Sequence, residues 1–435
     1  MKREKFLIYS IIIPLVIGLS ASHAIGARKK KASDKIKCII CHTQLGKDLA
    51  KKVEQWQSSV HGQNNVTCPA CHGGDPTSFN KPKTEESGYV GAPNRNELPE
   101  FCAKCHSSAS WMRQYNKRTD QLSLYRTSAH GKRLFEKNDE AVAVCTDCHG
   151  QHDIYPVADK ASSANHMKIA ETCAGCHSNN EIMEPRGLKS NQLQLYKKSY
   201  HGEILYGKIA NKNPGLVPSC PECHGIHGAT PAGVNEISHV CGNCHANNAE
   251  QFARGDHQEA LDKKGAPRCI DCHDYHEILF PTLALFDGAE KHHCGYCHPL
   301  KGHEYNIGQE IKNSIVKAQG KIDRVTALVG DIEYDPGLDV KDERDNLAEA
   351  QDYLLEVAPV THTIDLKYIK NYTNKSYELA VKTETVINKR ISEFIVRKKW
   401  LFATLMIIFM IIGYILFNRW TIHIQEETGE SALSR

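Results

Sequence analysis

Nine copies of the pattern Cys-x-x-Cys-His constrain this chain more than any other feature of its sequence. All 18 cysteines of the 435-residue chain belong to these copies, and none is left over. We number the motifs 1 to 9 along the chain: CIICH (38–42), CPACH (68–72), CAKCH (102–106), CTDCH (145–149), CAGCH (173–177), CPECH (220–224), CGNCH (241–245), CIDCH (269–273) and CGYCH (294–298).

Cys-x-x-Cys-His is the attachment pattern of c-type haem. Its two thiols add across the vinyl groups of the porphyrin, and the imidazole that follows binds the iron from one face. Cysteine pairs also build zinc sites and disulfide frameworks, but neither needs a histidine after every pair. The sequence therefore predicts nine covalently bound haem c groups. The predicted attachment residues are Cys38, Cys41, Cys68, Cys71, Cys102, Cys105, Cys145, Cys148, Cys173, Cys176, Cys220, Cys223, Cys241, Cys244, Cys269, Cys272, Cys294 and Cys297, and the motif histidines predicted to bind iron are His42, His72, His106, His149, His177, His224, His245, His273 and His298.

Few large side chains are present to build a conventional core, because aromatic residues make up only 7% of the chain. Between Cys38 and His303 there are roughly thirty residues for each motif, too few for separate protein cores. We expect the porphyrins themselves to form the core, because burial of apolar surface drives folding. This predicts a mainly α-helical, haem-packed domain with long loops over residues 28–303. The formal charge of +3 indicates no nucleic-acid partner, since the propionates of the haems would outweigh it.

The first 27 residues have the pattern of a secretory signal peptide. Basic residues at positions 2, 3 and 5 precede an apolar stretch that begins at Phe6 and gives way to small residues up to Ala27. An uncleaved N-terminal anchor is the alternative interpretation. Both require export, because c-type haem is attached on the outer side of the cytoplasmic membrane.

The stretch from Trp400 to Phe417 carries no charged residue and, as a helix of about 27 Å, is long enough to cross a bilayer. We predict a transmembrane helix over 400–418 and a cytoplasmic tail over 419–435, with the haem domain in the periplasm. The basic cluster 397–399 then lies on the periplasmic side, against the positive-inside rule. We give more weight to the attachment of haem outside the cytoplasmic membrane than to this rule when we orient the transmembrane helix. The basic cluster is then expected to lie on anionic headgroups of the outer leaflet.

The motif region repeats internally. Three repeats begin with Ser-x-His-Gly, at 59–62, 128–131 and 199–202, and each continues with two motifs. A fourth, degenerate repeat begins with His257 in the sequence GDHQ. Motif 1 therefore stands alone before four pairs.

Three motifs extend to a second histidine, as in CPECHGIHG at 220–228. This trailing histidine emerges near the side of its own motif histidine, so we expect it to bind the iron of a neighbouring haem. The glycine of Ser-x-His-Gly is expected to let a flat macrocycle approach the backbone closely. The lead-in histidines His61, His130, His201 and His257 and the trailing histidines His152, His227 and His276 are the predicted distal iron ligands. Alternative candidates are His166, His239, His292, His293, His303 and His362, together with Met112, Met167 and Met183.

Residues 304–399 contain no cysteine and are rich in Lys, Glu, Asp and Ile. Amphipathic patterns at about 305–330, 342–358 and 363–398 predict three helices separated by turns. We expect a helical hairpin or bundle that carries the haem domain above the bilayer, its last helix able to continue into the membrane span. No sustained heptad repeat is evident, which argues against a long coiled coil.

The paired motifs, the CHGxH extension and the Ser-x-His-Gly lead-in resemble the periplasmic multihaem cytochromes c of the cytochrome c3 and c554-like type, over about residues 36–303. The resemblance, here to a membrane-anchored nonahaem form, implies a haem-packed helical architecture and a role in respiratory electron transfer. The C-terminal anchor differs from the tetrahaem quinol dehydrogenases, which are usually anchored at the N-terminus. This difference argues against direct quinol oxidation.

Two functions are consistent with these features. The first is electron transfer between the quinone pool, or a membrane quinol-oxidising subunit, and periplasmic redox proteins, since bis-histidine ligation closes both axial positions of the iron. The alternative is a multihaem reductase in which one five-coordinate haem acts on nitrogen or sulfur oxyanions. Motif 1, outside the repeats, and motif 2, which reads CHGGDP, are the expected places for an open haem. No catalytic residue is assigned from the sequence.

Overall fold

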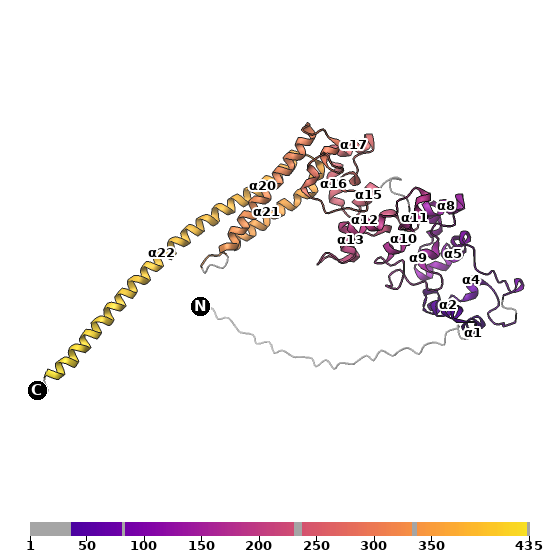
Figure 1. Ribbon diagram of the computed structural model, residues 1–435, viewed down its shortest axis with the longest axis horizontal. Coiled ribbons are helices and arrows are strands. Elements are labelled where there is room, and N and C mark those ends of the chain that lie inside the picture. The colour runs from indigo at the N-terminus through magenta and orange to yellow at the C-terminus, as the bar shows by residue number, and fades with distance from the viewer. Residues whose placement is uncertain (1–35, 81–82, 230–236, 333–336, 433–435) are drawn as a thin grey trace, which may run out of the picture. The chain divides into compact units, whose positions relative to one another are not determined.

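The computed structural model describes residues 36–80, 83–229, 237–332 and 337–432. Every regular element within these ranges is an α-helix or a 3-10 helix, so the predicted mainly helical class is confirmed (Figure 1). The predicted signal segment lies outside them. The chain divides into two compact units, of which the first contains residues 1–122 and 142–165 and the second contains residues 123–141 and 166–435.

Short helices joined by loops make up the first unit. They are α1 (Lys37–Gln44), α2 (Lys47–Ser58), α3 (Val60–Gln63), α4 (Cys68–His72), η2 (Glu85–Ser87), η3 (Arg95–Glu97), α5 (Leu98–His106), α6 (Ala109–Met112), η4 (Arg113–Tyr115) and α9 (Cys145–His149).

The motif-bearing part of the second unit is built in the same way. Its helices are α7 (Gln121–Thr127), α8 (Ala129–Lys137), α10 (Ile169–His177), α11 (Asn180–Met183), η5 (Glu184–Arg186), α12 (Gln192–Lys198), α13 (Tyr200–Leu205), η6 (Pro214–Leu216), α14 (Cys220–His224), α15 (Ile237–Gly242), α16 (Ala246–Ala253), α17 (Asp256–Lys264), α18 (Cys269–His273), η7 (Leu283–Phe286) and α19 (Cys294–Cys297). Helix α7 begins just before the division between the units.

Motifs 4, 6 and 8 each form a five-residue helix that begins at the first cysteine. The acidic residue before the second cysteine explains this start. Asp147, Glu222 and Asp271 each accept a hydrogen bond of 2.7 Å from the backbone N–H of the residue before the helix. An acidic side chain also stabilises the positive end of the helix dipole. The variable positions of these motifs therefore help to fix the turn that presents the thiols and the imidazole.

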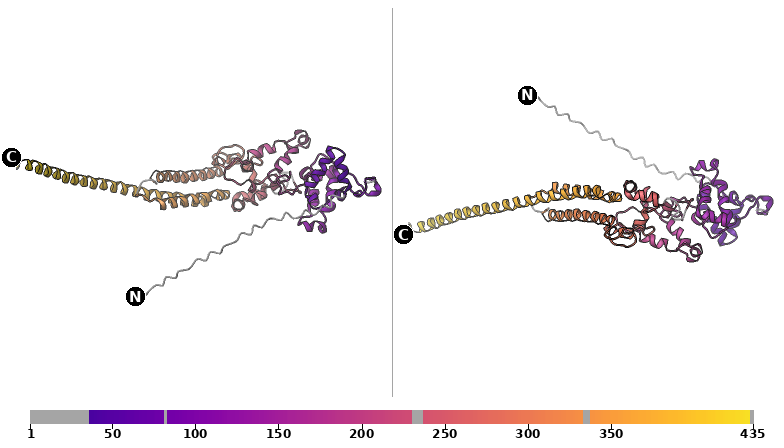
Figure 2. Two further views of the ribbon diagram at one scale, coloured as in Figure 1. Left: turned by 90° about the horizontal axis from the view of Figure 1, so that it is seen from below. Right: turned by 90° about the horizontal axis from the view of Figure 1, so that it is seen from above.

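The second unit ends in a bundle of three long helices, α20 (His303–Ile332), α21 (Lys341–Val360) and α22 (Leu366–Ala432), with η8 (Thr361–Thr363) between the last two. The helices lie side by side (Figure 2). The buried apolar residues recur every three or four positions in α21 and in steps of three, four and seven in α20, as expected for helices that share one core. The core residues include Ile311, Ala318, Ile322, Val325 and Val329 of α20, Leu347, Ala350, Leu354 and Val357 of α21, and Ile369, Ala380 and Ile387 of α22.

The buried positions of helix α22 follow the spacing of a heptad repeat, which its apolar residues alone do not show. Its buried positions alternate in steps of four and three, at Ile369, Thr373, Ser376, Ala380, Thr383 and Ile387. Hydroxyl residues at half of these positions hide the repeat from an apolar pattern. The Ser376 hydroxyl donates to the backbone oxygen of Ala350 on α21 at 2.7 Å, and Thr383 donates to Leu379 within α22 at 2.9 Å.

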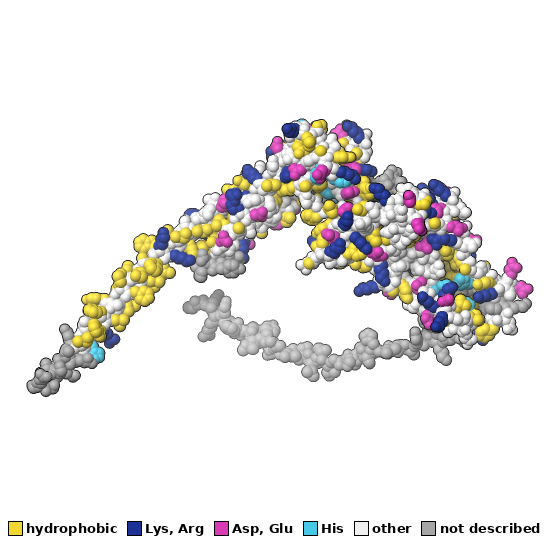
Figure 3. Space-filling model, in the orientation of Figure 1, with side chains coloured by type: hydrophobic (Ala, Val, Ile, Leu, Met, Phe, Trp, Pro, Cys, Tyr) yellow, Lys and Arg dark blue, Asp and Glu magenta, His cyan; other side chains and the backbone are white. Residues whose placement is uncertain are grey.

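Without a break, α22 continues from the bundle into the apolar stretch. An 18-residue window of it has a mean hydropathy of 2.5, and none of that window is buried. Hydrophobic side chains cover this part of the helix (Figure 3). By length and composition α22 can cross a membrane, and no other helix in the described ranges has this property.

An ion pair fixes the end of the bundle where α21 begins. Glu343 is only 1% exposed, and the Nε atom of Arg390 on α22 lies 3.2 Å from one of its carboxylate oxygens. Arg390 also donates hydrogen bonds to the other carboxylate oxygen at 3.3 Å and to the backbone oxygen of Asp339 at 2.6 Å. Because a buried carboxylate without a partner is strongly unfavourable, Arg390 holds α21 against α22.

We expect Arg390→Met to lower the free energy of local opening at this end of the bundle by about 3 kcal/mol, because Glu343 is left buried and unpaired. Hydrogen–deuterium exchange of the full-length protein in detergent, followed over residues 339–347 and 387–394, measures the change. The double variant with Glu343→Leu removes both charges and is expected to recover most of the loss. Equal exchange in the wild type and the single variant would contradict this assignment.

Candidate metal centres

Each Ser-x-His-Gly sequence forms the same junction between two helices. Ser59, Ser128 and Ser199 are almost completely buried, and each accepts a hydrogen bond of 2.9–3.1 Å from the glycine N–H three residues later. Each serine hydroxyl also donates to a carbonyl oxygen three residues earlier, in the preceding helix. This capping arrangement places the lead-in histidine in the first turn of the new helix.

The glycine of this junction is required by a close backbone contact. A Cβ atom on Gly62 would lie 2.1 Å from the carbonyl oxygen of Trp56, and one on Gly131 would lie 1.8 Å from that of Tyr125. Gly202 is crowded in the same way. The structure thus gives the glycine a role in making room for the preceding helix, and its expected role beside a macrocycle stays a prediction.

A backbone hydrogen bond joins each junction to the segment of one trailing histidine. The residue after the serine donates its N–H to a carbonyl two residues beyond a trailing histidine, in the bonds Val60–Ile154 (2.8 Å), Ala129–Ala229 (2.9 Å) and Tyr200–Ile278 (2.8 Å). The lead-in and trailing histidines are therefore positioned in relation to each other, although they stand far apart in the sequence.

Each lead-in histidine lies opposite the histidine of the second motif in its repeat. The ring centres are 6.0–6.2 Å apart. The pairs are His61–His106, His130–His177, His201–His245 and His257–His298. The degenerate fourth repeat thus places its histidine as the complete repeats do.

Two of the three trailing histidines lie opposite a motif of the preceding repeat. His152 faces His72 of motif 2, with ring centres 6.2 Å apart, although it follows motif 4 in the sequence. His276 follows motif 8 and faces His224 of motif 6 at 5.8 Å. The axial partners of His149 and His227 remain predictions.

Motif 8 faces a histidine from outside the repeats. The ring centre of His362, in η8, lies 6.1 Å from that of His273, and the two rings are 29° from parallel. The sequence presents His362 only as an alternative candidate, because it stands in the bundle segment, far from any motif. A sequence signal does exist, since motif 8 is followed by no further repeat that could supply a trailing histidine.

The ring spacing fits two imidazoles that bind one metal ion between them. Two metal–nitrogen bonds of about 2 Å, with about 1 Å from each nitrogen to its ring centre, place the centres roughly 6 Å apart. The seven described pairs match this spacing. Among the described residues there is no group of three or more His, Cys, Asp or Glu side chains suited to a bare metal ion. The residues present fit a haem: two opposed imidazoles would bind the iron from its two faces, and the two thiols of the motif would attach the porphyrin covalently.

Burial favours the neutral form of several of the paired histidines. It lowers the pKa of His61 and of His106, which face each other. Burial, together with the nearby charge of His224, lowers the pKa of His276 to about 4. Neutral imidazole is the form that binds metal ions, so these side chains are in the ligating form at neutral pH.

Cysteines of successive motifs lie close together. The first cysteines of neighbouring motifs are hydrogen bonded in the pairs Cys102–Cys145, Cys173–Cys220 and Cys241–Cys269. Cysteines of the other successive motifs lie close enough to interact electrostatically. These pairs are Cys38–Cys68, Cys71–Cys105, Cys223–Cys244 and Cys272–Cys294. Within the first unit, motifs 1 to 4 therefore have the same order in space as in the sequence. Within the second unit, the same is true of motifs 5 to 9.

Motif 1 differs from the paired motifs. Within the described residues no imidazole lies opposite His42, whose pKa is lowered by burial first and then by Lys83, His72 and Lys52. Two lysines thus make the surroundings of this motif cationic. Motif 2, the other place expected for an open haem, faces His152 instead.

Most of the alternative candidates do not face a motif histidine in the part of the chain that the structure describes. The Nδ1 atom of His166 lies 3.5 Å from Glu222, and His292 donates a hydrogen bond of 2.9 Å to the backbone oxygen of Asp271. His303 is exposed at the start of α20. The side chain of His239 lies outside the described residues.

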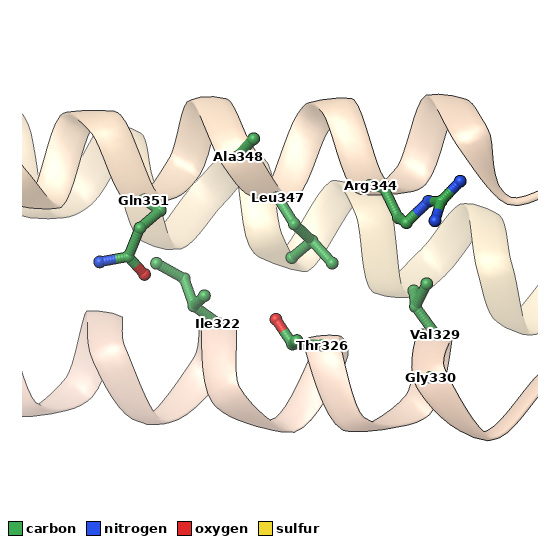
Figure 4. Close-up of a pocket in the computed structure, with 8 residues that line it drawn as sticks. All are labelled: Ile322, Thr326, Val329, Gly330, Arg344, Leu347, Ala348 and Gln351. Atoms are coloured by element: carbon green, nitrogen blue, oxygen red, sulfur yellow. The ribbon is translucent and has the colours of Figure 1, made fainter. Parts of the chain in front are cut away.

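A groove of about 350 Å³ lies between α20 and α21 (Figure 4). Ile322, Val329 and Leu347 give it an apolar lining, with Arg344 and Gln351 among its polar groups. No cysteine or histidine lines it, so the groove contributes nothing to the paired-histidine sites.

No known protein-family model matches this chain, and no curated protein shows significant similarity to it.

We expect Gly131→Ala to lower the local stability of the α7–α8 junction by about 2 kcal/mol, because its Cβ would collide with the carbonyl oxygen of Tyr125. Hydrogen–deuterium exchange over residues 125–137 measures the effect. Gly320→Ala is the matched control: it lies within α20 with no atom near the added Cβ, and should increase helix stability slightly. Unchanged exchange in Gly131→Ala would show that the close contact is not essential.

Proposed function

We propose that this chain is a membrane-anchored multihaem c-type cytochrome that transfers electrons between a membrane partner and periplasmic redox proteins. Each motif would hold one covalent haem c, nine in all, and the haems supply the one-electron chemistry. The proposal is carried by the seven histidine pairs, in which a motif histidine faces a second imidazole at the spacing of two axial ligands. Iron with two imidazole ligands passes electrons without binding a substrate.

The spatial order of the motifs supports electron transfer along the chain. The thiols attach to the edges of the porphyrins, so contact between cysteines of successive motifs brings neighbouring porphyrin edges together. Such contacts connect motifs 3 and 4 in the first unit, and motifs 5 and 6 and motifs 7 and 8 in the second. This succession favours a carrier over a set of independent haem sites.

The bundle favours a protein partner over quinone in the bilayer. Helix α22 runs unbroken from Leu366, just after η8, to Trp400, where the apolar stretch begins. This part of the helix is about 50 Å long at 1.5 Å per residue. With α22 anchored in the cytoplasmic membrane and the haems in the periplasm, the haem nearest η8 would stand far above the bilayer. The partner would therefore be a protein that itself extends from the membrane.

A second candidate function rests on motif 1. His42 has no facing imidazole among the described residues and lies near Lys52 and Lys83. A five-coordinate haem in cationic surroundings would suit an anionic ligand, as in a reductase of nitrogen or sulfur oxyanions.

We expect haem analysis of the full-length protein to give nine haems per chain, and quantified low-temperature electron paramagnetic resonance of the oxidised protein to show low-spin iron at the paired motifs. His61→Ala should convert one haem to high spin, because it removes the imidazole opposite His106. His166→Ala is the control, since His166 lies beside Glu222 and should leave the spectrum unchanged.

The same spectra decide between the two functions. A high-spin signal of about one haem in the wild type, shifted by nitrite, hydroxylamine or sulfite, would favour the reductase. Low-spin iron throughout would favour the carrier. Fewer than nine haems, or no spectral change in His61→Ala, would contradict the assignment of these residues.

We expect quinol confined to the bilayer of a nanodisc to leave the haems of the embedded protein oxidised, because the bundle holds them away from the bilayer. A soluble reductant, dithionite, should reduce all of them in the same sample. Haem absorption during anaerobic mixing measures both reactions. Rapid reduction by quinol alone would show that the bundle does not separate haem from membrane in this way.

A further inference from the structure

We propose that His362 of the bundle is the distal ligand of the haem on motif 8, which makes the bundle part of a haem site as well as a stalk. This inference rests on the proposed function, because it requires haem on motif 8. It adds an iron ligand from a segment that contains no Cys-x-x-Cys-His motif.

The orientation of His362 suits this role. Its ring centre lies 6.1 Å from that of His273, the same spacing as in the pairs within the repeats. Its Nδ1–H donates a hydrogen bond of 3.0 Å to the backbone oxygen of Pro359. A histidine whose one nitrogen donates to a carbonyl presents the other nitrogen to a metal ion, with ring and tautomer fixed.

The turn that carries His362 is held firmly in place. Thr363 is 5% exposed, and its hydroxyl donates to the backbone oxygen of Val360 at 2.8 Å and accepts from the N–H of Asp365 at 3.0 Å. On the motif side, a Cβ atom on Gly255 would lie 2.4 Å from the backbone oxygen of Thr363. The backbone before α17 therefore packs directly against η8, next to the lead-in histidine of motif 9.

A second contact joins the bundle to motif 9. A Cβ atom on Gly308, in α20, would lie 3.3 Å from the Sγ atom of Cys294. Lys312 of the same helix pairs with Asp287, just after η7. The bundle thus contacts the last two motifs at separate points.

The pattern of ligand donation gives an independent reason for this assignment. Motif 2 faces His152 and motif 6 faces His276, each supplied by the repeat that follows. Motif 8 belongs to the last repeat, so its ligand has to come from whatever follows the motif region. His362 occupies that position, and the bundle takes the place of a fifth repeat.

The test compares three variants of the full-length holoprotein in detergent: His362→Ala, His362→Met and, as control, His303→Ala. His303 is an exposed histidine at the end of the same bundle and should leave the spectra unchanged. We expect His362→Ala to keep nine haems while one becomes high spin. His362→Met should raise the midpoint potential of one haem, because methionine–histidine ligation has a higher potential than bis-histidine ligation.

Haem content and spin state separate the failure of this inference from the failure of the proposed function. A wild-type protein without nine haems overturns the proposed function. Nine haems in every variant, with the spin states and potentials of the wild type in both His362 variants, overturn the role of His362 alone. A high-spin haem or a raised potential in either variant, with the His303→Ala protein unchanged, supports it.

Discussion

The opposition of two imidazoles from distant parts of the chain is the interaction on which the motif region depends. The hydrophobic cluster described for this protein lies entirely in the bundle, from Ile311 to Ile387. In the motif region, buried apolar residues such as Leu134, Ile169 and Leu205 are spread thinly over separate short helices. The proposed haems would supply the missing apolar surface, and the histidine pairs would fix where each one lies. The bundle can therefore fold by ordinary side-chain packing, whereas the motif region would need the proposed haems to do so.

Local sequence explains much of what surrounds each site. The burial of Ser59, Ser128 and Ser199, the crowding at the glycine three residues later and the acidic caps of motifs 4, 6 and 8 all act within a few residues. Such features could be predicted from the sequence because a turn or cap is specified by its own residues. The contact of this glycine with the preceding helix was not expected, because it depends on the angle at the junction.

Features that depend on contacts between segments could be predicted only in part. The repeats indicate which histidines are candidate iron ligands. They do not indicate that His152 lies opposite His72, or that a backbone hydrogen bond joins Val60 to Ile154 nearby. His362 lay outside every repeat. In α22, Thr373, Ser376 and Thr383 occupy core positions that an apolar pattern counts as solvent-facing. In each case the role of the residue depends on the segment that packs against it and not on the type of its own side chain.

The backward direction of ligand donation imposes an order on assembly. A chain exported from its N-terminus would present each lead-in histidine before the motif that it faces. The iron of that motif could then bind both axial imidazoles as soon as its haem is attached. In the sequence, motifs 2 and 6 precede His152 and His276, and motif 8 precedes His362. In the proposed holoprotein, the haems of motifs 3, 5, 7 and 9 would therefore have both ligands at once, while those of motifs 2, 6 and 8 would have to wait for their second. The iron of motif 8 could bind its second imidazole only after the end of α21 has passed the translocation channel. The binding of this ligand would therefore mark a chain whose export is almost finished.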